Sequence, residues 1–107
     1  MSQAELRILV TTFPDREKAE DVTRLMVDAG LAVCGQVGAD LVSFYRWDGE
    51  VKRDTEVSVA FKILSKRFDL FVGELKQQHP HDVPQMVAWT ADWTNEAYLD
   101  WAKGTGK

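Results

Sequence analysis

The chain has 107 residues, of which 45% are hydrophobic, and this length and composition suit a single domain spanning residues 1–107. The formal net charge of −4 excludes the strongly basic surface that nucleic-acid-binding domains use, so we expect no nucleic-acid partner. The one cysteine, Cys34, excludes an intrachain disulfide, and the apolar run over residues 6–10 is far too short to cross a membrane, so we expect a cytoplasmic protein without a membrane partner.

The first predicted elements are a strand and a helix. Residues 6–12 are apolar and rich in β-branched side chains, which is typical of a strand buried on both faces. Pro14 ends this strand, Asp15 is a suitable N-cap, and Gly30 supplies the left-handed residue that commonly ends a helix. Between the two caps, small or apolar residues follow at helical spacing: Ala19, Val22, Leu25, Met26 and Ala29.

A long hairpin is predicted next. Residues 31–37 and 41–47 both have strand character, and the interruption at 38–40 indicates one long strand with a β-bulge. Asp48 and Gly49 form the strongest turn signal of the chain, because Asp-Gly favours a two-residue hairpin loop. Alternate positions of the returning strand are apolar, which predicts one face directed toward a core: Val57, Val59, Phe61 and Ile63.

The last third of the chain predicts two helices with a strand between them. Ser65 is expected to cap the first of these helices. Its apolar side consists of Phe68, Phe71, Val72 and Leu75. The prolines that follow His79 exclude further helix, and a last core strand is expected over residues 85–91. Thr94 is then expected to cap a short C-terminal helix that Gly104 ends.

This order, β-α-β-β-α-β plus a C-terminal helix, predicts an α+β domain of the ferredoxin-like, split β-α-β type. Right-handed crossovers would place the two longer helices on one face of a four-stranded antiparallel sheet. The other face, and a hairpin much longer than average strands, would then need cover from the C-terminal helix or from another subunit. The order of elements therefore predicts self-association.

Several motifs together resemble a known family. They are Val10-Thr11-Thr12-Phe13-Pro14, Gly30-Leu31-Ala32-Val33-Cys34, the run from Ser43 to Val51, Glu56, Lys62, His79-Pro80 with Val83-Pro84, and Tyr98-Leu99-Asp100-Trp101. Through these motifs the chain resembles the CutA divalent-cation tolerance family. The resemblance implies a cytoplasmic homotrimer with the long hairpin packed between subunits, linked to tolerance of divalent metals and of copper in particular. It also implies kinship of fold and assembly with the PII signalling proteins, which bind small molecules in clefts between subunits.

Six residues form a candidate intersubunit pocket for a small ligand. They are Tyr45, Trp47, Glu56, Lys62, Tyr98 and Trp101. The four aromatic residues suit either a subunit interface or an aromatic-lined ligand pocket, because their ring bodies are apolar and their tips polar. The two charged residues belong to the family motif, and the resemblance implies that Lys62 lies near His79 and holds a small anionic ligand. A solvent-exposed lysine is the alternative at this position.

Copper prefers thiolate, thioether and imidazole ligands, which makes His79 and His81 the candidate ligands for copper or another divalent cation. The resemblance implies a copper site built from one cysteine and two adjacent histidines. Thr11 and Gln78 stand at two of those positions here, only His79 matches, and His81 replaces a tyrosine. Alternatively, His79 bonds the last carbonyls of its own helix. Cys34, among apolar neighbours, is expected to be a buried, inert thiol.

The sequence has no motif for enzyme chemistry, such as a glycine-rich phosphate loop or a nucleophile elbow. We therefore expect a non-enzymatic homotrimer of divalent metal tolerance that binds a metal ion or small ligand between subunits. The alternatives are a PII-like signalling or scaffold module that binds a partner protein, and a small enzyme acting in an intersubunit cleft.

Overall fold

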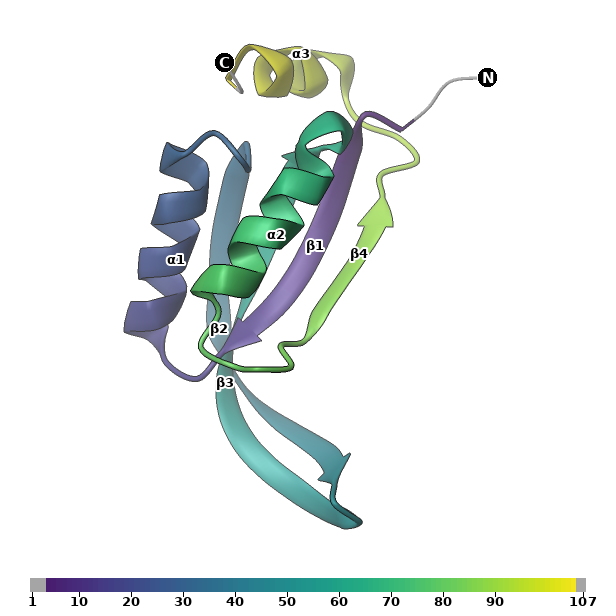
Figure 1. Cartoon of the computed structure of the whole chain (residues 1–107). Coiled ribbons are helices and arrows are strands. Elements are labelled where there is room, and N and C mark those ends of the chain that lie inside the picture. Colours follow the sequence, from purple (N-terminus) through teal and green to yellow (C-terminus); the bar gives the residue numbers. More distant parts are fainter. Residues whose placement is uncertain (1–3, 106–107) are drawn as a thin grey trace.

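The computed structural model describes residues 4–105, which form four strands and three α-helices (Figure 1). In chain order these are β1 (Leu6–Phe13), α1 (Arg16–Asp28), β2 (Cys34–Trp47), β3 (Glu50–Leu64), a 3-10 turn (Ser65–Arg67), α2 (Phe68–Gln78), β4 (Met86–Thr90) and α3 (Glu96–Thr105). The strands lie in the order β2-β3-β1-β4, and every neighbouring pair is antiparallel. This arrangement confirms the predicted α+β, ferredoxin-like fold. None of the helices within the described residues is long and apolar enough to cross a membrane.

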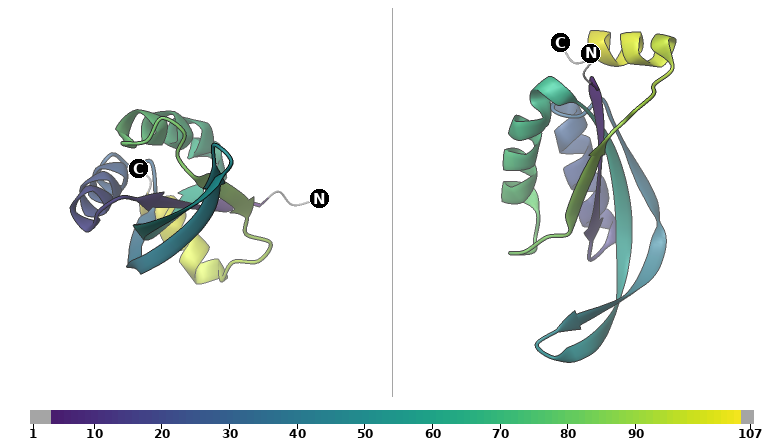
Figure 2. Two further views of the ribbon diagram at one scale, coloured as in Figure 1. Left: turned by 90° about the horizontal axis from the view of Figure 1, so that it is seen from below. Right: turned by 90° about the vertical axis from the view of Figure 1, so that its right-hand side faces the viewer.

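The core lies between the sheet and the layer formed by α1 and α2, which both pack on the same sheet face (Figure 2, right). Alternation along β1 and β3 directs one set of side chains into this layer. The fully buried large side chains include Leu9, Phe13, Phe61, Phe71 and Met26. Phe61 and Phe71 meet edge to face with ring centroids 4.9 Å apart, so the core joins the central strand directly to α2.

The opposite face of the sheet has no covering element within residues 4–105. The helix α3 lies across one end of the sheet, where a second apolar cluster forms around Leu6, Val33, Leu64 and Ala102 (Figures 1 and 2). The strand register puts Val87 and Trp89 on the uncovered face, opposite Val10 and Ile8. Both β4 side chains are exposed, so the predicted lack of cover on this face is confirmed for the single chain.

The β2–β3 hairpin extends well beyond both helices. Its strands have 14 and 15 residues, against about five or six in an average strand. Asp48 and Gly49 both have positive φ, 51° and 77°, as a two-residue loop that follows the strand twist requires. Figure 1 shows the two strands crossing below the end of β1, after which the hairpin bends beneath the loop that leads to β4.

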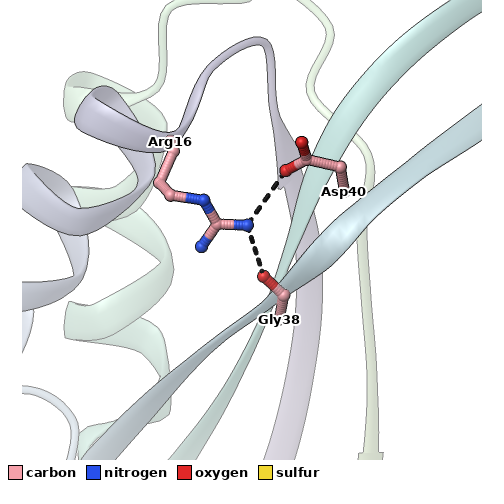
Figure 3. A network of polar contacts seen from close by, with 3 residues as sticks. All are labelled: Arg16, Gly38 and Asp40. Carbon is pink, nitrogen blue, oxygen red and sulfur yellow. Dashed lines mark hydrogen bonds and ion pairs between the residues drawn. The ribbon is translucent and has the colours of Figure 1, made fainter.

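The predicted β-bulge is present between Val37 and Asp40. One Arg16 Nη2 atom at the start of α1 donates to the carbonyl oxygen of Gly38 and to Asp40 Oδ1, each at 2.9 Å (Figure 3). The bulge frees the Gly38 carbonyl from the strand ladder, and the arginine takes it up. Because the ion pair is exposed, its main effect is to hold α1 against the bulge rather than to add much stability.

The two predicted limits of α1 are confirmed. Asp15 accepts a hydrogen bond from the Lys18 backbone at 2.8 Å, and Gly30 has φ 73° immediately after the C-cap Ala29. The predicted start of β2 at residue 31 is wrong. The backbone N–H groups of residues 31 and 32 both donate to the carbonyl of Met26, which wraps this segment around the helix end.

The predicted caps of the two later helices are also wrong. Ser65 begins the 3-10 turn, and its hydroxyl donates to the carbonyl of Ala4, so α2 starts only after Arg67 and without a side-chain cap. At α3, Asn95 rather than Thr94 accepts a backbone hydrogen bond from the first turn. Gly104 lies inside α3 rather than after it. Only at α3 does a neighbouring polar residue, Asn95, take the place of the expected cap.

We expect Gly35→Ala to lower the free energy of unfolding by about 1–3 kcal/mol or more, because a Cβ atom there would overpack the core. That atom would stand 2.4 Å from the Thr23 Cγ2 atom and 3.1 Å from the Phe61 ring. Gly73→Ala in α2 is the matched control, since its Cβ atom would meet open space and should stabilise the helix by about 0.5–1 kcal/mol. Denaturant titration at one protein concentration measures both; equal effects would contradict this packing.

Candidate functional site

The six predicted pocket residues fall into two groups within one chain. Tyr45, Trp47 and Glu56 lie on the hairpin beyond the end of β1, whereas Lys62 pairs in register with Ile8 near its start. Six residues of strand separate Glu56 from Lys62, which is roughly 20 Å. Tyr98 and Trp101 lie on α3, at the Lys62 end of the sheet (Figure 1). A single chain therefore does not bring the six residues into one pocket.

The first group lines a cavity of about 930 Å³ between the hairpin and residues 80–85. Tyr45, Trp47 and Glu56 share one face of the hairpin with Ser43 and Asp54. Neighbours among these residues are cross-strand partners or lie two positions apart, and such residues point to the same side of a sheet. The crossing of the two strands turns this face toward the loop before β4 (Figure 1). The cavity thus combines aromatic rings with carboxylates.

Glu56 is held in place at this cavity by two hydroxyl groups. Its Oε1 atom accepts from the Thr12 hydroxyl at 3.2 Å, and its Oε2 atom accepts from the Ser43 hydroxyl at 2.5 Å. The glutamate is half-buried, and each carboxylate oxygen retains a second lone pair for a ligand. Its negative charge is therefore fixed in position before any ligand arrives.

Tyr45 and Asp54 form a second polar pair in the cavity. The tyrosine hydroxyl donates a short hydrogen bond to Asp54 Oδ2. This hydrogen bond, together with partial burial and the negative charges of Asp54 and Glu56, raises the pKa of Tyr45. The hydroxyl therefore stays protonated, and the ring is fixed beside the carboxylate.

The second group lies where β2 and β3 meet α3. The Lys62 ammonium donates to the side-chain oxygen of Gln36. Cys34 begins β2 and is half-buried, and its Sγ atom lies 3.5 Å from the Tyr98 hydroxyl. The expectation of a thiol enclosed among apolar residues is therefore wrong. The contact with the thiol, followed by burial, raises the pKa of Tyr98 to about 12.

His79 is buried, with 7% of its surface exposed, and both ring nitrogens have partners. Nε2 lies 2.8 Å from the carbonyl oxygen of Thr12 and 3.3 Å from the Thr11 hydroxyl, so Nε2 carries the proton. Nδ1 accepts the backbone N–H of His81 at 3.1 Å. The ring also stacks on Phe13 at 4.6 Å. The side chain thus bonds β1 rather than the last carbonyls of its own helix.

These contacts do not fit a tight copper site in one chain. The lone pair on Nδ1 is occupied by the His81 amide, and Nε2 donates to a carbonyl, so coordination by His79 would break one of these bonds. The rings of His79 and His81 are 5.2 Å apart. Across residues 4–105, no three His, Cys, Asp or Glu side chains come together as a metal-binding group.

Sequence reasoning missed the polar partners of Glu56, although a signal was present. The Asp-Gly turn fixes the hairpin register, and counting outward from the pair Trp47 and Glu50 places Ser43 opposite Asp54. Thr12 carried no such signal, because its approach to Glu56 depends on the register between β1 and β3. Residues 80–85, which close the cavity, follow no periodic pattern at all.

We expect the free energy of unfolding to fall as the pH drops below about 6.5, in part because of His79. Burial lowers the pKa of His79 from its ordinary value of 6.5, so the unfolded chain takes up a proton before the folded chain does. Protonation would also set an N–H against the His81 amide. His79→Gln should flatten this part of the pH dependence, whereas the exposed His81→Gln should keep it. Denaturant titrations across this pH range measure both, and identical profiles would contradict the assignment.

The chain shares its fold and much of its sequence pattern with known proteins. Residues 7–105 match the family described as CutA1 divalent ion tolerance protein. The chain is 33% identical over 96 residues to the divalent-cation tolerance protein CutA of Thermus thermophilus, covering 90% of this chain and 93% of that protein. The CutA structure from Synechococcus elongatus superposes with a TM-score of 0.93 at 32% identity, covering 100% of this chain and 95% of that one. CutA1 from Pyrococcus horikoshii superposes with a TM-score of 0.90 at 33% identity, covering 94% and 98%. The chain therefore belongs to the CutA1 divalent ion tolerance protein family.

Proposed function

We propose that this protein is a cytoplasmic, non-enzymatic homotrimer that contributes to the tolerance of divalent cations by binding a small ligand between its subunits. Membership of the family supports the link to divalent cations. The observation that carries the proposal is the amount of apolar surface that the single chain leaves in water. The number of three subunits comes from the family resemblance.

The uncovered surface occupies the open sheet face and the hairpin. On the hairpin, Phe44 and Val51 are 68% and 65% exposed, and on the sheet face Val87 and Trp89 are 54% and 50% exposed. Covering one large apolar side chain contributes about 1.5–3 kcal/mol. Several such exposed residues on one chain are the kind of surface expected of a permanent subunit interface.

A cyclic assembly would also reconcile the two halves of the predicted pocket. The hairpin group, with Tyr45, Trp47 and Glu56, and the α3 group, with Lys62 and Tyr98, lie toward opposite ends of one chain. In a head-to-tail contact, the hairpin end of one subunit meets the other end of the next, and such contacts form a ring when the rotation between subunits closes. The ligand site in this proposal therefore takes one group from each of two subunits.

We expect Trp89→Glu to shift the assembled protein toward lower mass, because it would place a charge in the proposed interface. Leu70→Glu is the matched control, since Leu70 is 66% exposed on α2, which packs on the other face of the sheet. Light scattering after size-exclusion chromatography measures the mass of each. A wild-type protein that is a well-folded monomer at micromolar concentration would contradict the proposal.

Deleting the gene from its host should slow growth at raised copper, zinc or cobalt concentration if the protein contributes to cation tolerance. Wild-type protein and Leu70→Glu should restore growth, whereas Trp89→Glu should not, because the ligand site needs the assembled form. Growth rates across a series of metal concentrations measure the effect. Equal growth of the deletion and parent strains with every metal would argue against a role in tolerance.

A further inference from the structure

The cavity between the hairpin and residues 80–85 has a pronounced imbalance of charge. Asp54, Glu56 and Asp82 contribute three carboxylates to its lining. The lining includes one lysine, Lys52, and its ammonium is already 2.9 Å from the carboxylate of Glu50. A small anion would be repelled by this lining, whereas a cation would be attracted to it.

The walls of the cavity further restrict the kind of cation. Phe44, Tyr45 and Trp47 all contribute to the lining, and Trp47 and Phe44 are more than half exposed in the single chain. The face of an aromatic ring attracts a positive charge, most strongly for tryptophan, and the attraction grows when the cation is desolvated. Large apolar rings suit a cation that itself carries apolar groups rather than a hydrated metal ion.

The spacing of the carboxylates also disfavours a bare metal ion. Within residues 4–105, no three acidic, histidine or cysteine side chains come close enough together to hold a metal ion. Glu56 is fixed by the Thr12 and Ser43 hydroxyls, and Asp54 is engaged by Tyr45. Separate, fixed carboxylates beside aromatic rings match a bulky organic cation, whose positive charge is spread over its alkyl groups.

We propose that this cavity binds an organic ammonium ion, with Glu56 and Asp54 facing its charge and Trp47 packing against its alkyl groups. This inference rests on the proposed function of the cavity as one half of the ligand site, and it names the chemical class of the ligand. The small anion predicted at Lys62 concerns the other half of that site, because Lys62 lies at the other end of the chain.

Isothermal titration calorimetry of the assembled protein with tetramethylammonium tests the proposal, with neopentyl alcohol, an uncharged and water-soluble molecule of similar size, as the control. We expect tetramethylammonium to bind at least about tenfold more tightly than the alcohol. Glu56→Gln should weaken tetramethylammonium binding by about tenfold, and Trp47→Leu by about threefold to tenfold. Glu20→Gln, at an exposed position on α1, is the matched charge control and should leave binding unchanged.

Three outcomes would overturn the inference. They are no binding of tetramethylammonium by protein whose assembly is intact, equally tight binding of neopentyl alcohol, and complete displacement of tetramethylammonium by Mg²⁺ at equal ionic strength. Light scattering on the same samples separates this inference from the proposed function. If the assembly is intact but does not bind the ammonium ion, only the inference is wrong. If the wild-type protein is a monomer, the proposed trimer is wrong.

Discussion

The side chains of Leu9, Phe61 and Phe71 are fully buried between the sheet and the layer of α1 and α2, and this packing determines which sheet face is left over. Two helices can cover one face of four strands, and both are needed there to complete the core (Figure 2). The third helix, α3, packs at one end of the sheet, in the apolar cluster that contains Leu6 and Ala102. Within residues 4–105 no further element is left for the second face or for the hairpin, which is why we place the function of this protein in its assembled form.

Thr12 connects the main parts of the candidate site. Its carbonyl oxygen accepts a hydrogen bond from Nε2 of His79 at the end of α2, and its hydroxyl donates to Glu56 on the hairpin. The buried histidine therefore acts as a structural link between α2 and β1 in the single chain, and the position of the glutamate follows from the end of β1. An inner strand of the sheet therefore helps to position the cavity, although much of the cavity lining comes from a hairpin that extends into solvent.

The fold could be predicted because its signals are local and agree with one another. Asp15, Gly30 and the Asp48-Gly49 pair each require a particular backbone geometry, and they limit the helix and the hairpin correctly. The caps at Ser65 and Thr94 could not be predicted, because a hydroxyl group near a helix start has several possible acceptors and donors. The site was predictable only in part. Tyr45, Trp47 and Glu56 do share a cavity, but residues 80–85, which close it, follow no periodic pattern, so their place could not be predicted.

The bulge between Val37 and Asp40 reverses the alternation of side chains along β2. Before it, odd-numbered residues such as Gly35 face the core, and after it the odd-numbered Ser43, Tyr45 and Trp47 face away from the core side and line the cavity. The extra residue thus shifts the side-chain alternation by one position. One continuous strand can therefore direct its odd-numbered residues into the apolar core before the bulge and into the polar cavity after it. A relative of this protein could carry another side chain in place of Ala39 and keep the same alternation. A relative that lost one residue from this segment would have its aromatic rings turned out of the cavity.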